Sequence, residues 1–535
     1  MGALTLKSSP FEIRNWELEK FKSIDPTDGF ASNTSVYISK QQIVQIEPSY
    51  NQTSSSFWLS DKGRQFFDSV FEFEYLKNEK KSWNYILKFL FKILYFFDFC
   101  KSKQQQNYFF TFVIENVSIE IFSLLILFAQ NYSFIKLKRS EKIKLNNDLE
   151  SNFQLNFVVK KNNLLEKSTL ALLIANNPRY EGYLLNLNLR QRFLKGNFKC
   201  FILGSTIDLT FPINFLGTKL GIFKSITEGN NLICQNFKSA NNPCLVFNTE
   251  IFKRSDGKNI FQMIQFLNYS NTLNKIWNYN ILNSTLFETG LHNLSNLSYL
   301  TLKDLSQFSS FYFLNLTINN ISNFKKITKT KLLNCSKKKY IKINKLFIDQ
   351  TNSNKTNNLN FYSKNYILKN KNLNKYLYLP IKMFYENEET FINTQGLIKH
   401  TSKLVLKKKT KNSWKLLRNF LKKLKNNLIL INLKDNSTIF YDLKKKSKFK
   451  NYITFHYNAT YTINYNSFVL LTKNQPIYIN KNKYKNKKLK LFNTKLKYWL
   501  NDFFIGGKDG YSQDSVILTN CSNINRFQKT NFINN

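Results

Sequence analysis

Three short runs of apolar residues, each next to a turn or a helical pattern, constrain the fold of this chain most. Residues 108–114, 170–174 and 198–203 are mainly aliphatic or aromatic, as expected for strands that are covered on both faces of a sheet. Ser118 can cap a helix after the first run, and residues 183–193 have a helical pattern before the third. Strand, turn and helix alternating in this way predict an α/β body with a parallel sheet and right-handed crossovers.

The N-terminal part of the chain (1–70) has a different pattern, in which apolar and polar side chains alternate. Residues 35–39 and 43–46 alternate, and the polar residues 40–42 between them suit a turn. Two alternating runs joined by a short turn predict an antiparallel hairpin. We therefore expect a β-rich N-terminal domain that is followed by the parallel-sheet body.

Changes in composition divide the rest of the chain. Residues 321–375 are so rich in lysine and asparagine that we expect an insertion that loops out, because a long loop adds only a modest closure cost. Residues 376–379 return to a strand pattern, and residues 414–428 have the pattern of a basic amphipathic helix. Short alternating runs in the tail suggest strands of a small appended domain. The expected units are a β-rich domain (1–70), an α/β body (71–320), the insertion (321–375), the rest of the body (376–435) and a divergent, β-containing C-terminal extension (436–535).

The chain has a formal net charge of +45, with 79 basic residues against 34 acidic ones. Such a charge is typical of proteins that bind nucleic acids or anionic membranes. The excess is almost all lysine, whereas arginine usually makes the bidentate contacts to phosphate and guanine. Runs such as residues 407–409 and 444–446 therefore favour a solvated lysine-rich surface, with RNA contact as the alternative.

Local metal, nucleotide and membrane signals are weak. The six cysteines include no C-x-x-C pair, which is the local spacing of zinc and iron–sulfur sites. The three histidines lie far apart, and no G-x-G-x-x-G motif occurs. Residues 83–99 and 109–128 are apolar, but both contain acidic residues, which are costly in a bilayer. We predict buried helices or strands there and no transmembrane segment.

A series of short motifs gives the chain a likeness to a known family. The motifs are Gly2-Ala3-Leu4-Thr5, Trp16-Glu17-Leu18, Asn177-Pro178-Arg179-Tyr180-Glu181, Asn393-Thr394-Gln395-Gly396 and Trp414-Lys415-Leu416. In this order and spacing they resemble the C-terminal portion of the seventy-five-kilodalton subunit family of respiratory complex I. The likeness covers residues 2 to about 420 without the insertion, and Ala175 stands where the family usually has glycine.

The resemblance implies both a fold and a role. The α/β body resembles a molybdopterin oxidoreductase that has lost its cofactor. The implied role is that of a structural subunit in the peripheral arm of NADH:ubiquinone oxidoreductase, which scaffolds the iron–sulfur path from NADH to ubiquinone. No active site, cofactor or metal is expected on this chain, although the whole complex contains FMN and iron–sulfur clusters.

The resemblance also implies partners and a location. In the family a Cys-Pro-x-Gly-Ala-Leu-Thr motif supplies the last ligand of a [4Fe–4S] cluster, and Met1 takes the variable position of that motif here. We therefore expect a split mitochondrial gene and a separate chain that carries the ferredoxin-like iron–sulfur half. The other expected partners are peripheral-arm subunits, namely the NADH/FMN-binding subunit and those of the twenty-four-, forty-nine- and thirty-kilodalton types. No nucleic acid is expected as a partner. The sequence shows no N-terminal targeting segment, which is expected of a protein made inside the mitochondrion. The expected location is the matrix side of the inner membrane.

The Asn177-Pro178-Arg179 turn has two interpretations. It follows the predicted strand at 170–174, where ligands often bind in α/β sheets, so by resemblance it can meet a pterin nucleotide. The other interpretation is a structural turn in which Arg179 pairs with a carboxylate such as Glu181. A dinucleotide needs close backbone approaches, and only 15 glycines occur in the chain. The structural turn is favoured.

Two further candidates also have a structural and a functional interpretation. Cys100 lies nearest to the position where the family would place a molybdenum ligand, but its phenylalanine neighbours favour a buried thiol. An acidic cluster is formed by Glu386, Glu388 and Glu389. It can bind magnesium or act in catalysis, but the favoured interpretation is a salt-bridged loop that faces lysines. We assign no catalytic, cofactor-binding or metal residue. The alternative functions are an active molybdopterin oxidoreductase, with bound molybdenum and pterin, and a lysine-rich organellar RNA-binding protein.

Overall fold

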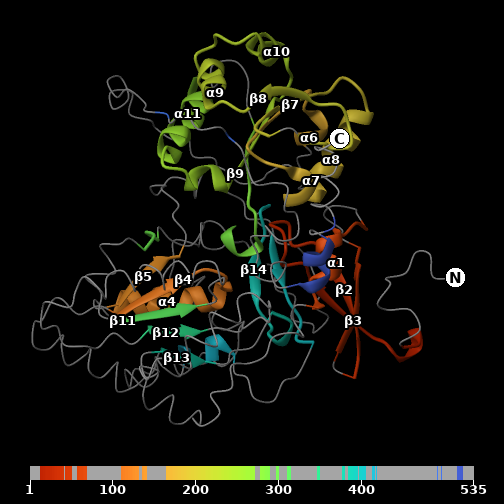
Figure 1. Ribbon diagram of the computed structural model, residues 1–535, viewed down its shortest axis with the longest axis vertical. Coiled ribbons are helices and arrows are strands. Elements are labelled where there is room, and N and C mark those ends of the chain that lie inside the picture. The colour runs from red at the N-terminus through yellow and green to blue at the C-terminus, as the bar shows by residue number, and fades with distance from the viewer. Residues whose placement is uncertain are drawn as a thin grey trace, which may run out of the picture.

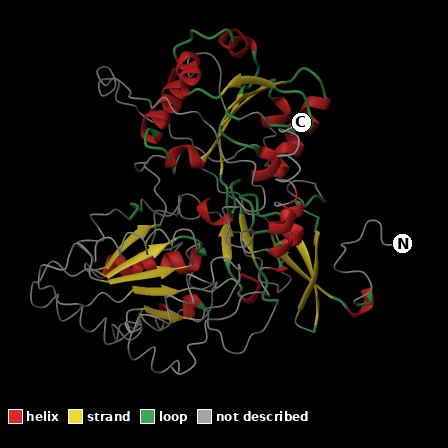
Figure 2. Cartoon of the chain, viewed as in Figure 1, coloured by secondary structure: helices red, strands yellow, loops and turns green. Residues whose placement is uncertain are grey.

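In a computed structural model of the chain, the described residues form two five-stranded parallel sheets, one three-stranded antiparallel sheet and one two-stranded sheet (Figure 1). The strands of each large sheet lie side by side, and helices flank them (Figure 2). The structure describes residues 13–40, 42–50, 57–68, 110–131, 135–140, 164–205, 207–270, 278–289, 297–300, 310–314, 346–349, 376–379, 384–395, 397–404, 412–415, 417–418, 491, 496, 515–521 and 524.

The N-terminal sheet consists of β1 (Glu19–Ile24), β2 (Asn33–Ser39) and β3 (Gln42–Pro48) in the order β1-β2-β3, after the 3-10 helix η1 (Asn15–Glu17). The strands β2 and β3 pair antiparallel, with Ser39 opposite Gln42. This pairing confirms the predicted hairpin. The short helix α1 (Asp61–Gln65) follows, and the Ser60 side chain accepts a hydrogen bond from the Gly63 amide at its start (3.0 Å).

The first parallel sheet has the order β10-β9-β6-β7-β8. Its core separates into one apolar cluster with α9–α11 and another with α6 and α8, so helices cover both faces. Both faces being covered explains why β6 and β9 are buried at every residue. The elements are α6 (Leu164–Lys167), β6 (Leu170–Ile174), α7 (Pro178–Glu181), α8 (Tyr183–Leu194), β7 (Lys199–Leu203), β8 (Asn214–Gly217), α9 (Leu220–Thr227), α10 (Ile233–Ser239), β9 (Cys244–Asn248), η4 (Thr249–Lys253), α11 (Gly257–Ser270) and β10 (Asn278–Leu282).

The second parallel sheet has the order β13-β12-β11-β4-β5. The helix α4 connects β4 to β5 and buries most of its described side chains, as expected for the apolar stretch at 109–128. The antiparallel pair β14–β15 lies between this sheet and the N-terminal sheet (Figure 1). The elements are β4 (Phe110–Ile114), α4 (Ile119–Asn131), β5 (Ile135–Arg139), β11 (Ser310–Leu314), β12 (Leu346–Asp349), β13 (Tyr376–Leu379), η7 (Phe384–Glu386), β14 (Thr390–Ile392) and β15 (Ile398–His400).

The predicted fold class is confirmed: a β-rich N-terminal part precedes an α/β body with parallel sheets. One segment differs from the expectation of an insertion that loops out. Within residues 321–375, β12 (Leu346–Asp349) pairs with both β11 and β13 and is therefore part of the sheet. A composition dominated by lysine and asparagine hid this short run of apolar residues. The rest of the insertion lies outside the described residues.

The described residues of the tail do not form the small appended domain that the sequence suggests. Leu496 belongs to the apolar core of the first parallel sheet, and Leu518 belongs to the core beneath the N-terminal sheet. The tail apart from residues 491, 496, 515–521 and 524 lies outside the described residues. So do the stretch at 83–99 and most of the helix predicted at 414–428. Among the helices that the structure describes, none has the length and apolarity needed to cross a bilayer.

Ala175, which directly follows β6, has a backbone φ of 47°. This left-handed conformation costs a residue with a β-carbon about 1–2 kcal/mol relative to glycine. Replacing Ala175 by Gly should therefore raise the free energy of unfolding by about 0.5–1 kcal/mol, after the larger entropy of glycine in the unfolded chain is subtracted. Denaturant unfolding measures the change. The matched control is Ala171→Gly in the middle of β6, which should lower the same free energy by a similar amount.

Candidate functional site

The first parallel sheet reverses its winding between its neighbouring strands β6 and β9. From β6 the chain continues through α7 and α8 to β7, whereas β9 lies on the other side of β6 and leads through α11 to β10. Open α/β sheets bind ligands in the crevice outside the carboxyl ends of the strands at such a reversal. Asn176 and Asn177 follow β6 there, and Asn248 and Thr249 lie at the end of β9. We define these residues and their neighbours as the carboxyl-edge site.

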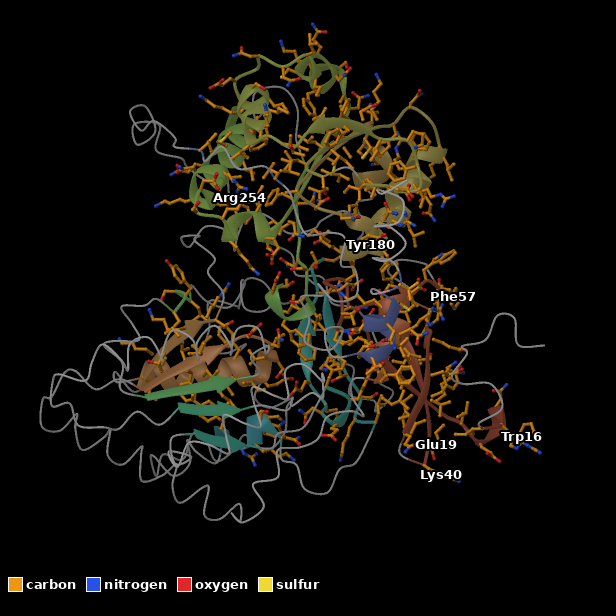
Figure 3. The ribbon with its side chains drawn as sticks, in the orientation of Figure 1. Trp16, Glu19, Lys40, Phe57, Tyr180 and Arg254 are labelled. Carbon is orange, nitrogen blue, oxygen red and sulfur yellow. The ribbon has the colours of Figure 1, made fainter. Side chains whose placement is uncertain are left out.

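The carboxylate of Glu181 occupies the part of this site next to α7. Its Oε2 atom accepts hydrogen bonds from the Asn177 backbone amide (3.1 Å) and from the Asn248 side-chain amide (2.7 Å). Pro178 starts α7, so Asn177 supplies the backbone amide that an anion would use at the start of this turn. The position is taken by a negative charge that belongs to the chain itself. In Figure 3, the labelled Tyr180 of α7 and Arg254 stand on opposite sides of this edge.

A second carboxylate, that of Glu288, lies at the same edge beyond β10. It accepts a hydrogen bond from the Thr249 hydroxyl (2.9 Å), and it also accepts bonds from the backbone amide (3.2 Å) and the hydroxyl (3.1 Å) of Ser284. All three residues are buried. Glu181 and Glu288 together make the edge acidic and internally hydrogen-bonded.

A turn from the N-terminal sheet covers the edge from outside. Phe30, which is 2% exposed, packs in the apolar core of the first parallel sheet together with Leu282. A β-carbon added to Gly182 would lie only 2.8 Å from both side chains. At the neighbouring position, a β-carbon on Gly29 would clash with the carbonyl oxygen of Asn283. Two glycines therefore permit the turn to approach the sheet closely at these positions.

Hydrogen bonds fix this covering turn in place. The buried Asp28 carboxylate accepts bonds from the backbone amides of Phe30 (3.0 Å) and Ala31 (3.2 Å). From the other side, the Asn393 side-chain amide donates to the Phe30 carbonyl (2.9 Å), and the Thr394 amide donates to the Gly29 carbonyl (2.7 Å). Burial, followed by the nearby Asp25 carboxylate, raises the pKa of Asp28. The turn is thus held by both the N-terminal sheet and the segment after β14.

These residues do not fit a pterin nucleotide. Its phosphates require a site that is rich in backbone amides and free of negative charge, but Glu181 already binds the amide of Asn177. Phe30 fills the space above β10. The buried side-chain amide of Asn177 makes no hydrogen bond to a described residue. Because this amide is neutral and carries both a donor and an acceptor, it is better suited to bind a water molecule than an anion. Within the described ranges, no cluster of three or more His, Cys, Asp or Glu side chains is arranged to bind a metal.

The structure shows where the sequence-predicted turn residues lie. The structural interpretation of Asn177-Pro178-Arg179 agrees with the closed network, and Arg179 pairs with a carboxylate as expected, although the carboxylate differs from the example given. The guanidinium pairs with Asp208 (2.7 Å) instead of Glu181, and its Nη1 atom also donates to the Asp208 carbonyl. Glu181 points toward Asn248 in the core of the site, whereas Asp208 lies at the surface. Cys100 lies outside the described residues.

The acidic cluster of Glu386, Glu388 and Glu389 lies at the end of η7 and directly after it. Glu388 is exposed, but Glu386 and Glu389 are buried. The carboxylate of Glu389 accepts a hydrogen bond from the Asn387 side chain (3.1 Å). Burial, followed by the nearby Glu120 carboxylate on α4, raises the pKa of Glu389 to about 8. Glu389 is therefore an interior acid near a second buried acid, and its surroundings favour the neutral form.

Sequence reasoning missed Phe30, Glu288 and Glu120. Phe30 and Glu120 act through contacts with segments that lie far away along the chain, and Glu288 reaches back across the sheet edge to Thr249. No spacing rule connects such segments.

Comparisons with known proteins complete the description of the site. Residues 79–423 match the model of the molybdopterin oxidoreductase family. The 75 kDa subunit of NADH-ubiquinone oxidoreductase from Reclinomonas americana is 30% identical over 320 residues, which cover 55% of this chain and 45% of the relative. The 78 kDa subunit from Neurospora crassa is 26% identical over 307 residues, covering 54% and 40%. NADH dehydrogenase (ubiquinone) iron-sulfur protein 1 from Solanum tuberosum is 25% identical over 291 residues, covering 52% and 38%. The chain thus spans less than half the length of these relatives. The expected likeness to the 75 kDa subunit family is confirmed.

Proposed function

The chain belongs to the molybdopterin oxidoreductase family, and we propose that it is a non-catalytic structural subunit of the peripheral arm of NADH:ubiquinone oxidoreductase. Relatives that are named as subunits of that enzyme support the assignment. Two of them are named as mitochondrial, which supports a mitochondrial location. We place the chain on the matrix side of the inner membrane and propose that the mitochondrial genome encodes it.

The closed carboxyl-edge site is the observation that carries the non-catalytic part of this proposal. A family member with pterin chemistry must admit a large anionic cofactor to this kind of crevice. Here Glu181 binds the backbone amide of Asn177, and Phe30 fills the space above the sheet. Side chains of the protein itself close this edge, and they pack the first parallel sheet against the N-terminal sheet. Such fixed packing between parts of the chain is what a structural scaffold requires.

The proposed partners rest on the resemblance to the 75 kDa subunit of the same enzyme, of which this chain matches 45% in Reclinomonas americana. We propose that a separate polypeptide supplies the ferredoxin-like half with the iron–sulfur ligands. In this arrangement the chain holds that half against the other peripheral-arm subunits and scaffolds the electron path from NADH to ubiquinone. FMN and the iron–sulfur clusters belong to those partners.

An exposed aromatic patch next to the N-terminal sheet is suited to such a partner. Tyr50, Phe57 and Trp58 are 50%, 62% and 60% exposed, and the rings of the first two lie 5.1 Å apart. The Tyr183 hydroxyl donates to the carbonyl of Trp58 (2.8 Å), and the next residue, Leu59, is buried. The patch is therefore anchored from below. Figure 3 labels Phe57 at the outer side of this region. Exposed and rigidly held aromatic residues are typical of protein interfaces.

Replacing Trp58 by Ala should weaken the association of the chain with the rest of the complex by at least about tenfold, the effect expected of an aromatic hot spot. Blue-native electrophoresis of solubilised mitochondria measures the fraction of chain in the complex. The matched control is Phe215→Ala on β8, an aromatic residue that is 46% exposed on a different unit. Equal effects of the two substitutions would contradict an interface at the patch.

Metal and cofactor analysis of the purified full-length chain tests the non-catalytic role. We expect no stoichiometric molybdenum and no extractable pterin, because the site that would take them is filled. Stoichiometric molybdenum and pterin would show an active molybdopterin oxidoreductase instead. RNA that stays bound at low salt and is lost steeply with rising salt would support the RNA-binding alternative, which rests on the net charge of +45.

A further inference from the structure

An exposed arginine on α8 has almost no partner within the described part of the chain. Arg190 is exposed, and its Nη1 atom lies 3.5 Å from the Thr210 hydroxyl, at the limit of a hydrogen bond. It makes no other hydrogen bond or ion pair with a described residue. Five other described arginines contact an acidic side chain, a backbone carbonyl or an aromatic ring: Arg14, Arg179, Arg192, Arg254 and Arg418. Arg190 is therefore available to a group from outside the chain.

Arginine rather than lysine at this position is informative. Nine of the 79 basic residues are arginines, so most of the positive charge of the chain is lysine. A guanidinium presents a rigid fork of donors that matches the two oxygens of a carboxylate, whereas a lysine presents a point charge. An exposed guanidinium that is not engaged by its own chain thus favours recognition of a planar anionic group.

The loop beside Arg190 is held rigidly. It contains Thr210, whose φ of 70° is an outlier for a β-branched residue. The residues on both sides of it, Leu209 and Phe211, are 0% and 9% exposed and belong to the apolar core of the first parallel sheet. The Asn186 side-chain amide also donates to the Leu209 carbonyl (3.2 Å). Two buried anchors thus keep a strained backbone in place, and such strain is concentrated at functional sites.

A carboxylate on the same loop decides which kind of anion fits. The Asp208 side chain is 75% exposed, and it accepts hydrogen bonds from the Arg179 guanidinium (2.7 Å) and the Thr210 amide (2.8 Å). The bond from the Thr210 amide lowers the pKa of Asp208, and the Arg179 guanidinium lowers it further. This exposed negative charge repels a polyanion such as RNA or an anionic lipid surface. It suits a protein surface that brings one carboxylate to Arg190 and a hydrogen-bond donor to Asp208.

The aromatic patch and Arg190 lie on the same side of α8. The Tyr183 hydroxyl at the start of this helix donates to the carbonyl of Trp58, which belongs to the patch (2.8 Å). Arg190 comes seven residues later, which is two helical turns and about 10 Å along the helix axis. A single partner chain can therefore contact the patch and Arg190 together.

We propose that Arg190, Asp208 and Thr210 form a docking surface for a partner protein that brings a carboxylate side chain to Arg190. The two oxygens of that carboxylate accept both donors of the guanidinium fork, and the partner donates a hydrogen bond to Asp208. The identity of the partner, a peripheral-arm subunit of the complex that oxidises NADH, rests on the proposed function.

Chemical footprinting tests this docking surface without a substitution. The purified full chain and the chain within the isolated complex are treated with phenylglyoxal, which modifies arginine, and with a carbodiimide and an amine, which modify carboxylates. Mass spectrometry measures the rate at each position. Modification of Arg190 and Asp208 should be at least about tenfold slower in the complex, because the core of an interface excludes water. The matched control is Glu228 at the end of α9, whose side chain is 49% exposed and should react equally in both.

Variants of the full chain separate the shape of the guanidinium from its charge. Arg190→Ala should lower the fraction of chain in the complex by at least about tenfold on blue-native electrophoresis, the effect expected when one partner of an interfacial charge pair is removed. Arg190→Lys should lose most of that fraction as well, because lysine keeps the charge but not the fork. The matched control is Lys195→Ala, an exposed cation directly after α8, which should assemble like the parent.

The docking surface and the proposed function can fail separately. Equal modification of Arg190 in the free chain and in the complex, equal slowing at Glu228, or normal assembly of Arg190→Ala would overturn the docking surface alone. Assembly of Arg190→Lys like the parent would overturn the bidentate pairing. Protection of Arg190 in the purified chain by polyuridylic acid, lost at high salt, would replace the protein partner by RNA. Absence of the parent chain from the complex would overturn the proposed function and with it the partner.

Discussion

Replacing Phe30 by Ala should lower the free energy of unfolding by about 3–5 kcal/mol, which is the usual cost of removing a buried phenylalanine ring. The ring is 2% exposed and lies against Leu282 and Gly182. The loss should be at the upper end of this range, because the turn is fixed by hydrogen bonds from Asn393 and Thr394 and cannot collapse into the cavity. Urea unfolding followed by circular dichroism measures the change.

The matched control for Phe30 is Phe57→Ala. Phe57 is 62% exposed, so its removal should change the free energy of unfolding by no more than about 0.5 kcal/mol. If the two alanine variants were equally stable, Phe30 would not be packed into the parallel-sheet core, and the closed carboxyl edge would lose its cover. The Phe30→Ala variant should also expose the edge, seen as faster hydrogen exchange at the amides of Asn177 and Gly182.

Replacing Glu389 by Gln should stabilise the chain at pH 8 and change it little at pH 5. Burial raises the pKa of this carboxyl from 4.5 to about 8 in the folded protein. The folded state therefore holds the proton more tightly than the unfolded state, and the stability falls as the pH rises from about 4.5 to about 8. Gln removes this penalty, so the gain at pH 8 should be about 4 kcal/mol.

The glutamine keeps the oxygen that accepts from the Asn387 side chain (3.1 Å), so the pH dependence isolates the charge. Thermal unfolding at pH 5, 6.5 and 8 measures it. The matched control is Glu388→Gln at the adjacent exposed position, for which the difference from the parent should not grow with pH. A Glu389→Gln gain of equal size at pH 5 and pH 8 would mean that Glu389 is ionised in the folded state.

The parts of the fold that repeat a local pattern could be predicted from the sequence. The strand at 170–174 is a continuous apolar run, and the strand at 199–203 is apolar after Lys199. The hairpin of β2 and β3 alternates between apolar and polar side chains. Burial on two faces or one face imposes those patterns directly. The strand β12 was not found, because its four residues lie in a lysine- and asparagine-rich context that is typical of loops.

The carboxyl-edge site could be predicted only in part. The position of Asn177 after a buried strand marked it, because parallel sheets place their ligand crevices there. The rest of the site could not be deduced, since Asn248 and Phe30 reach this sheet edge from distant parts of the chain. The pairing of Arg179 with Asp208 was missed for the same reason: a local carboxylate was available at Glu181, but tertiary packing turned it toward the core.

Isolation of the complex that oxidises NADH tests whether this chain is one of its subunits. Mitochondrial membranes are solubilised, NADH:ubiquinone oxidoreductase is purified by activity, and its chains are identified by mass spectrometry. We expect this chain to co-purify in constant ratio with the activity, together with a separate chain that carries the ferredoxin-like iron–sulfur ligands. Its absence from the active particle, or its migration with ribosomes, would show that it is not a subunit of this enzyme.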